Sequence, residues 1–531
     1  MPRAVTAECA DRKAGNPFLD PIVARDRSVL FARFENEDDW TAVDHAALLV
    51  RAAQFAALYT QAGIRLQETI LVILRPGLDP HAAFLGAMLI GAIPSFMPYP
   101  NAKQSHDIYW RQHRTIFETV RPQAVLVYDD ISDLVAAACD GLDIVVLSQE
   151  AVDALTPIPS WDIPDTDAIA FIQYSSGTTG LKKGVPISYA ALAGHIHAYR
   201  DALRLDETAQ TVIATWLPLY HDMGLITGFL LPLLLGVPII SVDPFEWTMR
   251  PGDFLTVAGT FRATHIWLPN FALLHHANHA GALENLDLST VAAIICCSEP
   301  CKPAAFDAFL DRFAVAALRP TALQTCYAMA ETVFAVTQSH IGTPPRRLRI
   351  EDGRELLSNG PPIAGCAIKI LDDGEICIKA PWLFDGYQSD PVVFDDGYFR
   401  TGDLGFLDGG ELFVCGRIKD IIIINGRNIF AHDVEAAVSA HAPVKPGRVV
   451  AFGQFSDAQG SEQLILVAET NDAASTAEIN RIVLAAVGVA CHDIRLVAPG
   501  WLIKTTSGKV SRSENKQKYT KHFHLTGGSI Q

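Results

Sequence analysis

Apolar positions follow two different periods along the first part of the chain. Helical spacing, with apolar side chains every three to four residues, covers residues 45–59 and 80–91. Short β-branched apolar runs lie between such segments, at residues 69–74, 124–128, 144–147, 212–216 and 293–296. Strands that alternate with helices in this way predict largely parallel sheets covered by helices, which is an α/β fold.

The pattern changes after about residue 340. Residues 367–371 and 375–379 alternate apolar and polar on either side of Asp372-Asp373-Gly374, which is typical of a hairpin. A small β-rich subdomain is therefore expected over about 340–418. Beyond it, strands are predicted near 449–452 and 464–467, and a helix over 475–487. We expect a large N-terminal domain of βα-built sheets with this β subdomain, residues 1–418, and a small α+β C-terminal domain, residues 419–531. No internal repeat or low-complexity segment interrupts this organisation.

Length and composition fit a compact protein of at least two domains. The chain has 531 residues, of which 49% are hydrophobic and 19% charged. Its 42 basic and 59 acidic residues give a net charge of −17, which argues against a nucleic-acid partner. Ten scattered cysteines without CxxC spacing indicate reduced thiols, and a polar N-terminus predicts no export. We expect a cytoplasmic location.

The longest apolar stretch covers residues 228–240. Pro232, Gly236 and Pro238 interrupt it, and it is too short to cross a bilayer. It is interpreted as buried core, so no stable membrane insertion is expected.

A loop rich in glycine and hydroxyl groups is the strongest chemical signal. Residues 174–185 read Tyr-Ser-Ser-Gly-Thr-Thr-Gly-Leu-Lys-Lys-Gly-Val and follow the apolar run 168–172. Such a loop offers backbone N–H groups and hydroxyls, and Lys183 is able to reach a phosphate. It is not the common phosphate loop, because Leu181 follows Gly180 where a Lys-Ser/Thr pair is needed. A flexible surface turn is the alternative reading of the loop alone.

Seven sequence blocks in a fixed order carry a resemblance. They are the loop at 174–185, WLPLYHDMGL at 216–225, SEP at 298–300, YAMAET at 327–332, YFRTGDL at 398–404, GRIKD through GRN at 416–428, and KTTSGK at 504–509. Together they resemble the superfamily of adenylate-forming enzymes, which includes acyl-CoA synthetases, luciferases and adenylation domains. Within it, the chain is most similar to the fatty acyl-AMP ligases.

The resemblance implies ATP and Mg²⁺ as cofactors and assigns residues to the phosphates. In adenylation a carboxylate attacks the α-phosphate of ATP, so cations and N–H donors must offset the negative charge. The phosphate contacts implied by the loop are Ser175, Ser176, Gly177, Thr178, Thr179, Gly180 and Lys183. Thr178 and Glu331 are the implied magnesium ligands, Glu331 through a hard carboxylate oxygen. Lys509 is the implied catalytic lysine between substrate carboxylate and α-phosphate. A solvated helix acid and a surface lysine are the alternatives for Glu331 and Lys509.

Further residues are implied for the nucleoside and the acid. Asp403 and Arg417 match ribose contacts, although Asp403 also suits a plain Asx turn. Ser298, Glu299, Pro300, Tyr327, Ala328 and Thr332 match nucleotide-binding segments, with a core aromatic as the alternative for Tyr327. His221 matches the position where acyl pocket and nucleotide meet, and a core histidine is its alternative. Trp267 and Phe271 are candidates for the acyl pocket, and Trp267 would then favour a short, medium or compact acid.

One histidine cluster competes as a site. His275, His276 and His279 fall within five residues, and the first and last share a helix face, which is a metal-ligand spacing. The zincin pattern fails because no glutamate follows the first histidine. A structural helix is the preferred interpretation.

The expected function is ATP-dependent activation of a carboxylic or fatty acid to acyl-AMP, followed by transfer to the phosphopantetheine thiol of an acyl carrier protein. The alternative is an acyl-CoA synthetase, and a third hypothesis is an adenylate-binding scaffold without turnover. The chain departs from the group at Lys182, Ile429, Phe430 and Ala431, and residues 339–360 contain no recognisable insertion of the acyl-AMP ligase kind.

The resemblance also implies rotation of a mobile C-terminal domain about a hinge at Lys419 and Asp420. A basic cluster follows in the C-terminal segment. It comprises Lys504, Lys509, Arg512, Lys516, Lys518 and Lys521, with Glu514 the only acid. A solvated helix is one interpretation, and a docking surface for an acidic carrier protein is the other.

Overall fold

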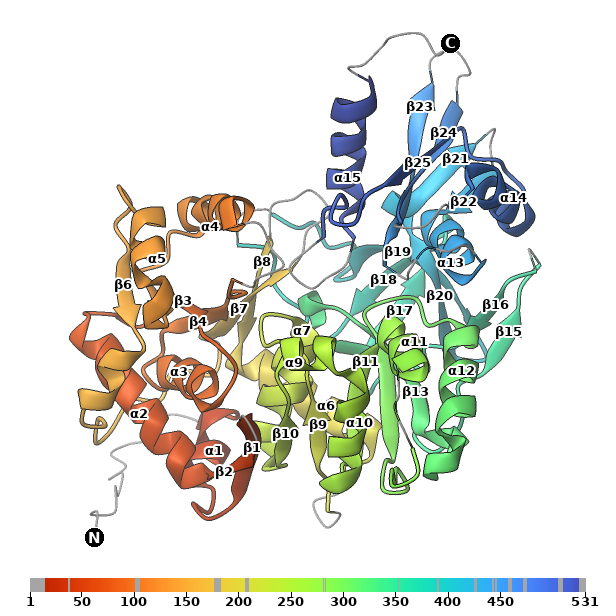
Figure 1. Ribbon diagram of the computed structural model, residues 1–531. Coiled ribbons are helices and arrows are strands. Elements are labelled where there is room, and N and C mark those ends of the chain that lie inside the picture. The colour runs from red at the N-terminus through yellow and green to blue at the C-terminus, as the bar shows by residue number, and fades with distance from the viewer. Residues whose placement is uncertain are drawn as a thin grey trace.

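The computed structural model describes residues 15–36, 39–100, 106–175, 183–205, 210–279, 281, 283–351, 353–388, 391–424, 427–441, 444, 447–456, 461–470, 475–504 and 510–524. Below, the N-terminal unit means residues 15–417 and the C-terminal unit residues 418–524. The fold is of mixed α/β type, as predicted (Figure 1).

An eight-stranded sheet forms the centre of the N-terminal unit, in the order β14-β13-β12-β11-β9-β10-β1-β2. Its inner pairs are parallel, and the edge pairs β13–β14 and β1–β2 are antiparallel. The strands are β1 (Leu30–Asn36), β2 (Asp39–Asp44), β9 (Ile213–Thr215), β10 (Ile239–Ser241), β11 (His265–Pro269), β12 (Ala293–Cys297), β13 (Leu323–Ala328) and β14 (Ala335–Gln338).

A second, four-stranded parallel sheet has the order β4-β3-β5-β6. It consists of β3 (Thr69–Ile73), β4 (Ile93–Phe96), β5 (Ala124–Val127) and β6 (Val145–Ser148). The antiparallel hairpin of β7 (Ile169–Ser175) and β8 (Lys183–Ser188) follows it in the chain. The predicted strands 69–74, 124–128, 144–147, 212–216 and 293–296 are confirmed with end shifts of a residue or so.

Local sequence signals explain where the helices begin. Asp44 caps α2 (His45–Gln61) by accepting from the Ala47 amide, and Ser188 caps α6 (Tyr189–Leu203) through the Ala191 amide. Gly86 allows α3 (Leu78–Leu89) to pack closely on α2, since a Cβ there would lie 2.5 Å from the Ala52 carbonyl oxygen. The other helices of this unit are α1 (Leu19–Ala24), α4 (His106–Val120), α5 (Ser132–Ala138), α7 (Asp222–Leu225), α8 (Leu231–Leu235), α9 (Pro244–Met249), α10 (Pro251–Thr260), α11 (Asn270–His279) and α12 (Pro303–Phe313).

The apolar stretch 228–240 is core, as predicted. Its residues continue from a π-helical turn, Ile226–Leu230, through α8 and into β10. Phe229, Leu231 and Leu233 are fully buried. No described helix is long and apolar enough to cross a membrane.

The β-rich part expected after residue 340 is also present. Its four-stranded sheet has the order β17-β18-β19-β20, and a separate hairpin pairs β15 with β16. These strands are β15 (Arg347–Arg349), β16 (Glu355–Leu357), β17 (Ala367–Ile370), β18 (Glu375–Lys379), β19 (Phe399–Asp408) and β20 (Glu411–Arg417). Gly374 has φ +85° in the predicted turn between β17 and β18, a conformation that favours glycine.

The C-terminal unit has its own sheets and cores. β23 (Val449–Ser456), β24 (Ser461–Glu469) and β25 (Asp493–Val497) form one sheet, and β21 (Ile421–Ile424) pairs with β22 (Arg427–Phe430). Its helices are α13 (Ala431–His441), α14 (Thr476–Val487) and α15 (Arg512–Tyr519). The large hydrophobic cluster ends at Leu412, and two separate clusters start at Ile422 and Val450. This unit forms the blue lobe in Figure 1, and a domain boundary at 418/419 stays a prediction.

Candidate active site

The β7–β8 hairpin presents the glycine-rich loop. Ser175 ends β7 and Lys183 begins β8, and the two residues are register partners. Antiparallel pairing therefore fixes both ends of the loop on neighbouring strands. The loop residues predicted to contact phosphate, Ser176, Gly177, Thr178, Thr179 and Gly180, lie outside the described residues, as does the predicted lysine Lys509.

Glu331 lies in a short 3₁₀ turn, η6 (Ala330–Thr332), directly after β13. The Tyr387 hydroxyl donates to its Oε1 at 2.6 Å, and the Phe384 amide donates to its carbonyl oxygen at 2.9 Å. Burial raises the pKa of the Glu331 carboxyl, an effect that the Tyr387 hydrogen bond and the Arg417 charge oppose. The hydroxyl of Thr332 donates to the Met329 carbonyl oxygen at 3.1 Å and so holds the turn.

A buried carboxylate joins two strands of the β-rich sheet. Asp403 on β19 and Arg417 on β20 are register partners, and Arg417 Nε donates to Asp403 Oδ1 at 2.7 Å. The Tyr327 hydroxyl donates to Asp403 Oδ2 at 2.6 Å. Burial, together with the Asp403 carboxylate, raises the pKa of the Tyr327 phenol, and Asp403 raises the pKa of the Arg417 guanidinium. Tyr327 thus supports Asp403 through its hydroxyl. Its sequence motif placed Tyr327 in a nucleotide-binding segment and did not predict this hydrogen bond.

His221 precedes α7 and is half-buried. Its Nδ1 lies 2.6 Å from Asp222 Oδ1 and accepts from the Met223 amide at 3.3 Å. The Asp222 carboxylate also contributes to the raised pKa of Glu331, after burial. His221 therefore belongs to the same charged neighbourhood as Glu331.

The segment 298–300 follows β12 and is tied to the start of α11. Ser298 has φ +68°, a strained left-handed conformation for a residue with a Cβ. Glu299 Oε2 accepts from the Phe271 amide at 3.2 Å. Phe271, a predicted acyl-pocket residue, is 38% exposed at this end of α11. The predicted nucleotide residue Ala328 ends β13, on which Tyr327 also lies.

The second predicted acyl-pocket residue, Trp267, lies inside the protein on β11. Its Nε1 donates to the Tyr199 hydroxyl at 2.9 Å, and that hydroxyl donates to Gln338 Oε1 at 3.0 Å. All three side chains are buried. Because α6, β11 and β14 each supply one of them, the chain of hydrogen bonds fixes the packing of helix on sheet at this place.

The hinge residues Lys419 and Asp420 form a short turn, η7 (Ile418–Asp420), after β20. Arg512 contacts Asp420 at 2.5 Å and Glu435 at 2.9 Å. These acids outweigh burial and raise the pKa of the Arg512 guanidinium. Lys504 and Val510, which bracket the undescribed segment 505–509, form an isolated β-bridge.

The basic cluster is therefore not one solvated surface. Arg512 is held by acids of its own unit, and Lys518 Nζ donates to the Trp501 carbonyl oxygen at 2.5 Å while lying 4.4 Å from that ring's centroid. Lys516 and Lys521 are exposed. The sequence showed the charges of Arg512 and Lys518 but not these contacts, and a docking role for the two residues stays a prediction.

The histidine cluster is accounted for by packing. His276 is buried and accepts from Trp247 Nε1 at 3.2 Å, and His279 Nδ1 lies 2.9 Å from the His275 carbonyl oxygen. Burial lowers the pKa of His276 to about 3. Within the described part of the chain, no group of three or more His, Cys, Asp or Glu side chains is arranged to hold a metal ion.

Comparisons with known proteins decide the family. The model of the AMP-binding enzyme family matches residues 23–388. The chain belongs to this family. Its resemblance to adenylate-forming enzymes is thereby confirmed, and so is the prediction that it is an enzyme.

Relatives of this AMP-binding enzyme extend over nearly its whole length. It is 30% identical over 519 residues to the long-chain-fatty-acid–AMP ligase FadD23 of Mycobacterium tuberculosis, covering 86% of this chain and 87% of the relative. It is 28% identical over 530 residues to the medium-chain-fatty-acid–[acyl-carrier-protein] ligase JamA of Moorena producens, with 88% of each chain covered. A solved structure from work on fatty acyl-adenylate ligases of E. coli and L. pneumophila has a TM-score of 0.87 at 24% identity, covering 96% of this chain and 98% of that one. That likeness confirms the fold.

Two features of this AMP-binding enzyme were not found from its sequence. Tyr387, which contacts Glu331, is preceded by Gly386 at φ +143°, and only that glycine hinted at a turn here. Asp433 on α13 contacts Lys302 at 2.8 Å and Arg354 at 3.1 Å, so it joins the C-terminal unit to the N-terminal unit. Neither contact leaves a local sequence signal, because the partners lie far apart in the chain.

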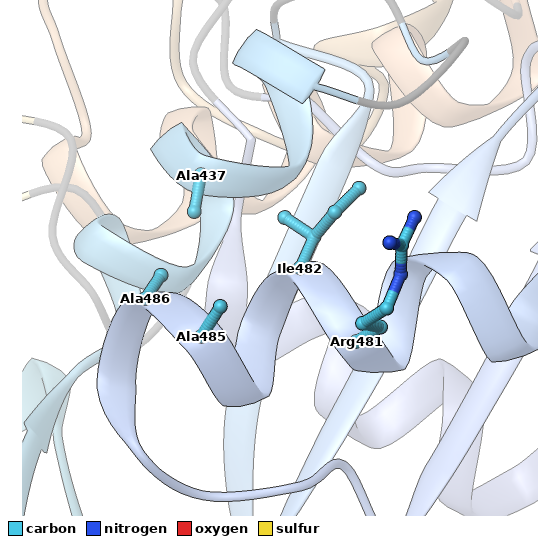
Figure 2. A pocket seen from close by; sticks show the side chains of 5 residues that line it. All are labelled: Ala437, Arg481, Ile482, Ala485 and Ala486. Atoms are coloured by element: carbon cyan, nitrogen blue, oxygen red, sulfur yellow. The ribbon is translucent and has the colours of Figure 1, made fainter.

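A pocket of about 420 Å³ lies elsewhere, between α13 and α14 (Figure 2). It is lined by Ala437, Arg481, Ile482, Ala485 and Ala486. None of these is a candidate site residue. Four of the pocket's five lining side chains are aliphatic.

Proposed function

We propose that the enzyme activates a carboxylic acid with ATP and then transfers the acyl group to the phosphopantetheine thiol of an acyl carrier protein. In the first step a carboxylate oxygen of the acid forms a bond to the α-phosphorus, the bond from that phosphorus to the bridging oxygen breaks, and pyrophosphate leaves. In the second step the thiol sulfur attacks the acyl carbon, AMP leaves, and the thiol proton is released.

One observation carries the proposal. Glu331, the Tyr327–Asp403–Arg417 cluster and the β7–β8 hairpin gather in one place, although they come from distant parts of the chain. The Arg417 charge acts on the pKa of Glu331, so the two groups lie close enough to interact. A carboxylate suited to ribose hydroxyls, a carboxylate suited to a metal and a loop that offers phosphate contacts form a combined nucleotide site.

The residues fit Mg²⁺ as the metal. Magnesium at phosphate sites is held through one or two carboxylates plus the substrate phosphates, not by a full protein cage. Glu331 supplies such a carboxylate, and Thr178 is proposed as a second ligand. When bound, the ion neutralises charge on the phosphates. Asp403 orients the ribose, Lys183 binds phosphate, His221 lies at the carboxylate end, and Lys509 stabilises charge during attack.

The names of the relatives support a fatty acid as the substrate class, and the name of JamA supports a carrier protein as acceptor. We propose a rotation about Lys419 and Asp420 between the two steps. Two separate hydrophobic clusters in the C-terminal unit support a division near this turn.

The experiment is acid-dependent ATP–pyrophosphate exchange with a panel of carboxylic acids, followed by acceptor assays with CoA and with carrier protein, and mass identification of products. We expect exchange with a subset of the acids and acyl transfer to the carrier. Efficient acyl-CoA formation without transfer to a carrier would replace the proposed acceptor by CoA. Absence of exchange with every acid would contradict the proposal as a whole.

A further inference from the structure

A short segment connects the two parts of the phosphate-handling site. It consists of residues 384–388 and is called the bridge segment here. The Phe384 amide donates to the Glu331 carbonyl oxygen at 2.9 Å, and the Gln388 amide donates to the Gly184 carbonyl oxygen at 2.9 Å. One end of the bridge segment therefore holds the turn that carries Glu331, and the other end holds the β8 side of the phosphate-loop hairpin.

The hairpin is held on both of its strands. The Tyr174 hydroxyl on β7 donates to Gln388 Oε1 at 3.1 Å, in addition to the main-chain bond from Gln388 to β8. The approach is close, because a Cβ at position 184 would lie 2.8 Å from Gln388 Oε1. Gly184 thus permits the side chain of Gln388 to lie against the hairpin.

Tyr387, at the centre of the bridge segment, contacts a charge on each side. Its hydroxyl donates to Glu331 Oε1 at 2.6 Å, the short distance typical of a hydrogen bond to an ionised acceptor. Lys183 Nζ lies 4.6 Å from the centroid of its ring, within the range of a cation–π interaction. Phe384 packs edge-on against the same ring, with centroids 4.9 Å apart at 70°, and so restricts its rotation.

We propose that Tyr387 is a positioning residue that holds the Glu331 carboxylate and the Lys183 ammonium at a fixed separation. The proposal rests on the proposed function, which gives Glu331 to the metal and Lys183 to phosphate. A carboxylate that binds a metal is oriented by its outer hydrogen bonds, and loss of such a partner weakens metal affinity or activity by about 10- to 100-fold. Tyr387 acts on Glu331 in that way and, through the face of its ring, on Lys183 at the same time.

The test uses Tyr387→Phe in the full-length enzyme, which keeps the ring and removes only the donor. The matched control is Tyr398→Phe. Tyr398 directly precedes β19, and its ring centroid lies 5.6 Å from Lys379 Nζ, so it also has a lysine over its ring. Binding of a non-hydrolysable ATP analogue is measured by calorimetry with Mg²⁺ and with EDTA, and pyrophosphate exchange is measured across a Mg²⁺ titration. We expect Tyr387→Phe to raise the half-saturating Mg²⁺ concentration about tenfold and to leave nucleotide binding in EDTA unchanged. Tyr398→Phe should match the unmodified enzyme in both.

A second variant separates the two contacts. Tyr387→Leu also removes the ring face, so we expect it to weaken nucleotide binding in EDTA as well, through the freed Lys183. A double-mutant cycle with Glu331→Gln tests the route of the effect: if Tyr387 acts through Glu331, its hydroxyl has little further effect on the Mg²⁺ dependence once that carboxylate is gone.

Three outcomes overturn the proposal: a Mg²⁺ dependence unchanged in Tyr387→Phe, additive effects in the cycle, or an equal loss in the Tyr398→Phe control. An unmodified enzyme whose nucleotide binding ignores Mg²⁺ overturns it too, while acid-dependent exchange in that enzyme still upholds the proposed function. Melting temperatures of all variants are compared, and a loss explained by unfolding alone also counts against a positioning role.

Discussion

Charged groups inside the N-terminal unit and charged groups that join the two units are held in different ways. In the N-terminal unit, Asp403 is 3% exposed and receives hydrogen bonds from Tyr327 and Arg417. The contacts that join the units are more open, since the side chains of Lys302 and Asp433 are 32% and 19% exposed. A buried charge needs its partners, whereas a partly solvated pair can exchange them for water at small cost. Such a difference is what the proposed rotation of the C-terminal unit past a fixed nucleotide site requires.

The largest effect is expected at Lys509, which the proposed function places in the adenylation site. Lys509→Ala should lower adenylation by about a thousandfold or more, because a charge that stabilises the transition state is lost. Thioester formation from supplied acyl-AMP should persist, since the proposed rotation removes this lysine from the site. Pyrophosphate exchange and single-turnover transfer measure the two steps separately. Equal loss in both steps would contradict the division of labour between the units.

Acid should destabilise the N-terminal unit more steeply than the C-terminal unit. Burial lowers the pKa values of five of its histidines, to about 3 for His195 and His276 and to about 4 for His45, His81 and His265. In the C-terminal unit burial similarly lowers the pKa of His432 to about 4. Each such histidine binds its proton more readily when unfolded. The stabilisation that each such histidine gives the folded state is therefore fully present above a pH of about 6.5. It is lost as the pH falls toward the folded-state pKa, by about 1.4 kcal/mol per pH unit.

Thermal and denaturant unfolding between pH 7.5 and pH 5 measure this loss. His276→Gln is the informative variant, because its amide oxygen can still accept from Trp247 Nε1 but does not titrate in this range. We expect a shallower fall in the free energy of unfolding for this variant. If the free energy of unfolding falls equally steeply with pH in both proteins, the pKa of His276 is not lowered in the folded state.

A change in the interior of the N-terminal unit should alter the chain length of the preferred acid. Trp267→Gly removes a buried ring that is hydrogen-bonded to Tyr199, and we expect preference to shift toward longer acids if this volume borders the acyl chain. Truncation of a buried aromatic side chain costs about 3–5 kcal/mol of stability, so assays are run well below the melting temperature. Tyr199→Phe is the control, since it removes the hydrogen bond and keeps the volume. An unchanged chain-length profile in Trp267→Gly would give Trp267 a purely structural role.

The sequence predicted the fold and the residue types of the site more fully than their contacts. Helices such as α2 and α14 were predictable because apolar spacing and a capping side chain, Asp44 or Ser475, are local signals. The contact from Tyr387 to Glu331 spans 56 residues, and that from Lys302 to Asp433 spans 131. Only the folded chain brings such pairs together. Arg512 illustrates the same limit, because a charge visible in the sequence gave no indication of its acidic partners.

The contact between the units offers a smaller effect. Asp433→Asn keeps the size of the side chain and removes the charge that pairs with Lys302 and Arg354. Burial alone would raise the pKa of Asp433, but Lys302, His432 and Arg354 outweigh it and leave that pKa lowered. We expect the ratio of adenylation to transfer rates to change by about threefold to tenfold, since one orientation loses a charge-assisted contact. The control is Glu514→Gln, at a half-buried acid on α15. Rates that change in parallel would argue that Asp433 supports folding alone.

The smallest effect is expected at the carrier-docking surface. Lys516 and Lys521 are exposed on and just after α15, whereas Arg512 pairs with Asp420 and Glu435. Arg512→Glu would leave Glu435 and Asp420 facing a third acid and would destabilise the C-terminal unit. A loss of transfer in such a variant would report damage to the C-terminal unit.

The double variant Lys516→Glu/Lys521→Glu avoids this damage, because both lysines are exposed. We expect it to slow transfer to a carrier protein about threefold at low ionic strength and little at high salt, because rim charges act mainly on encounter rates. Pyrophosphate exchange should be unaffected, since neither residue belongs to the nucleotide site. Transfer rates measured across a salt series decide the matter: a normal rate at low salt would place carrier docking elsewhere, and the exposed lysines of α15 would then be an ordinary solvated helix face.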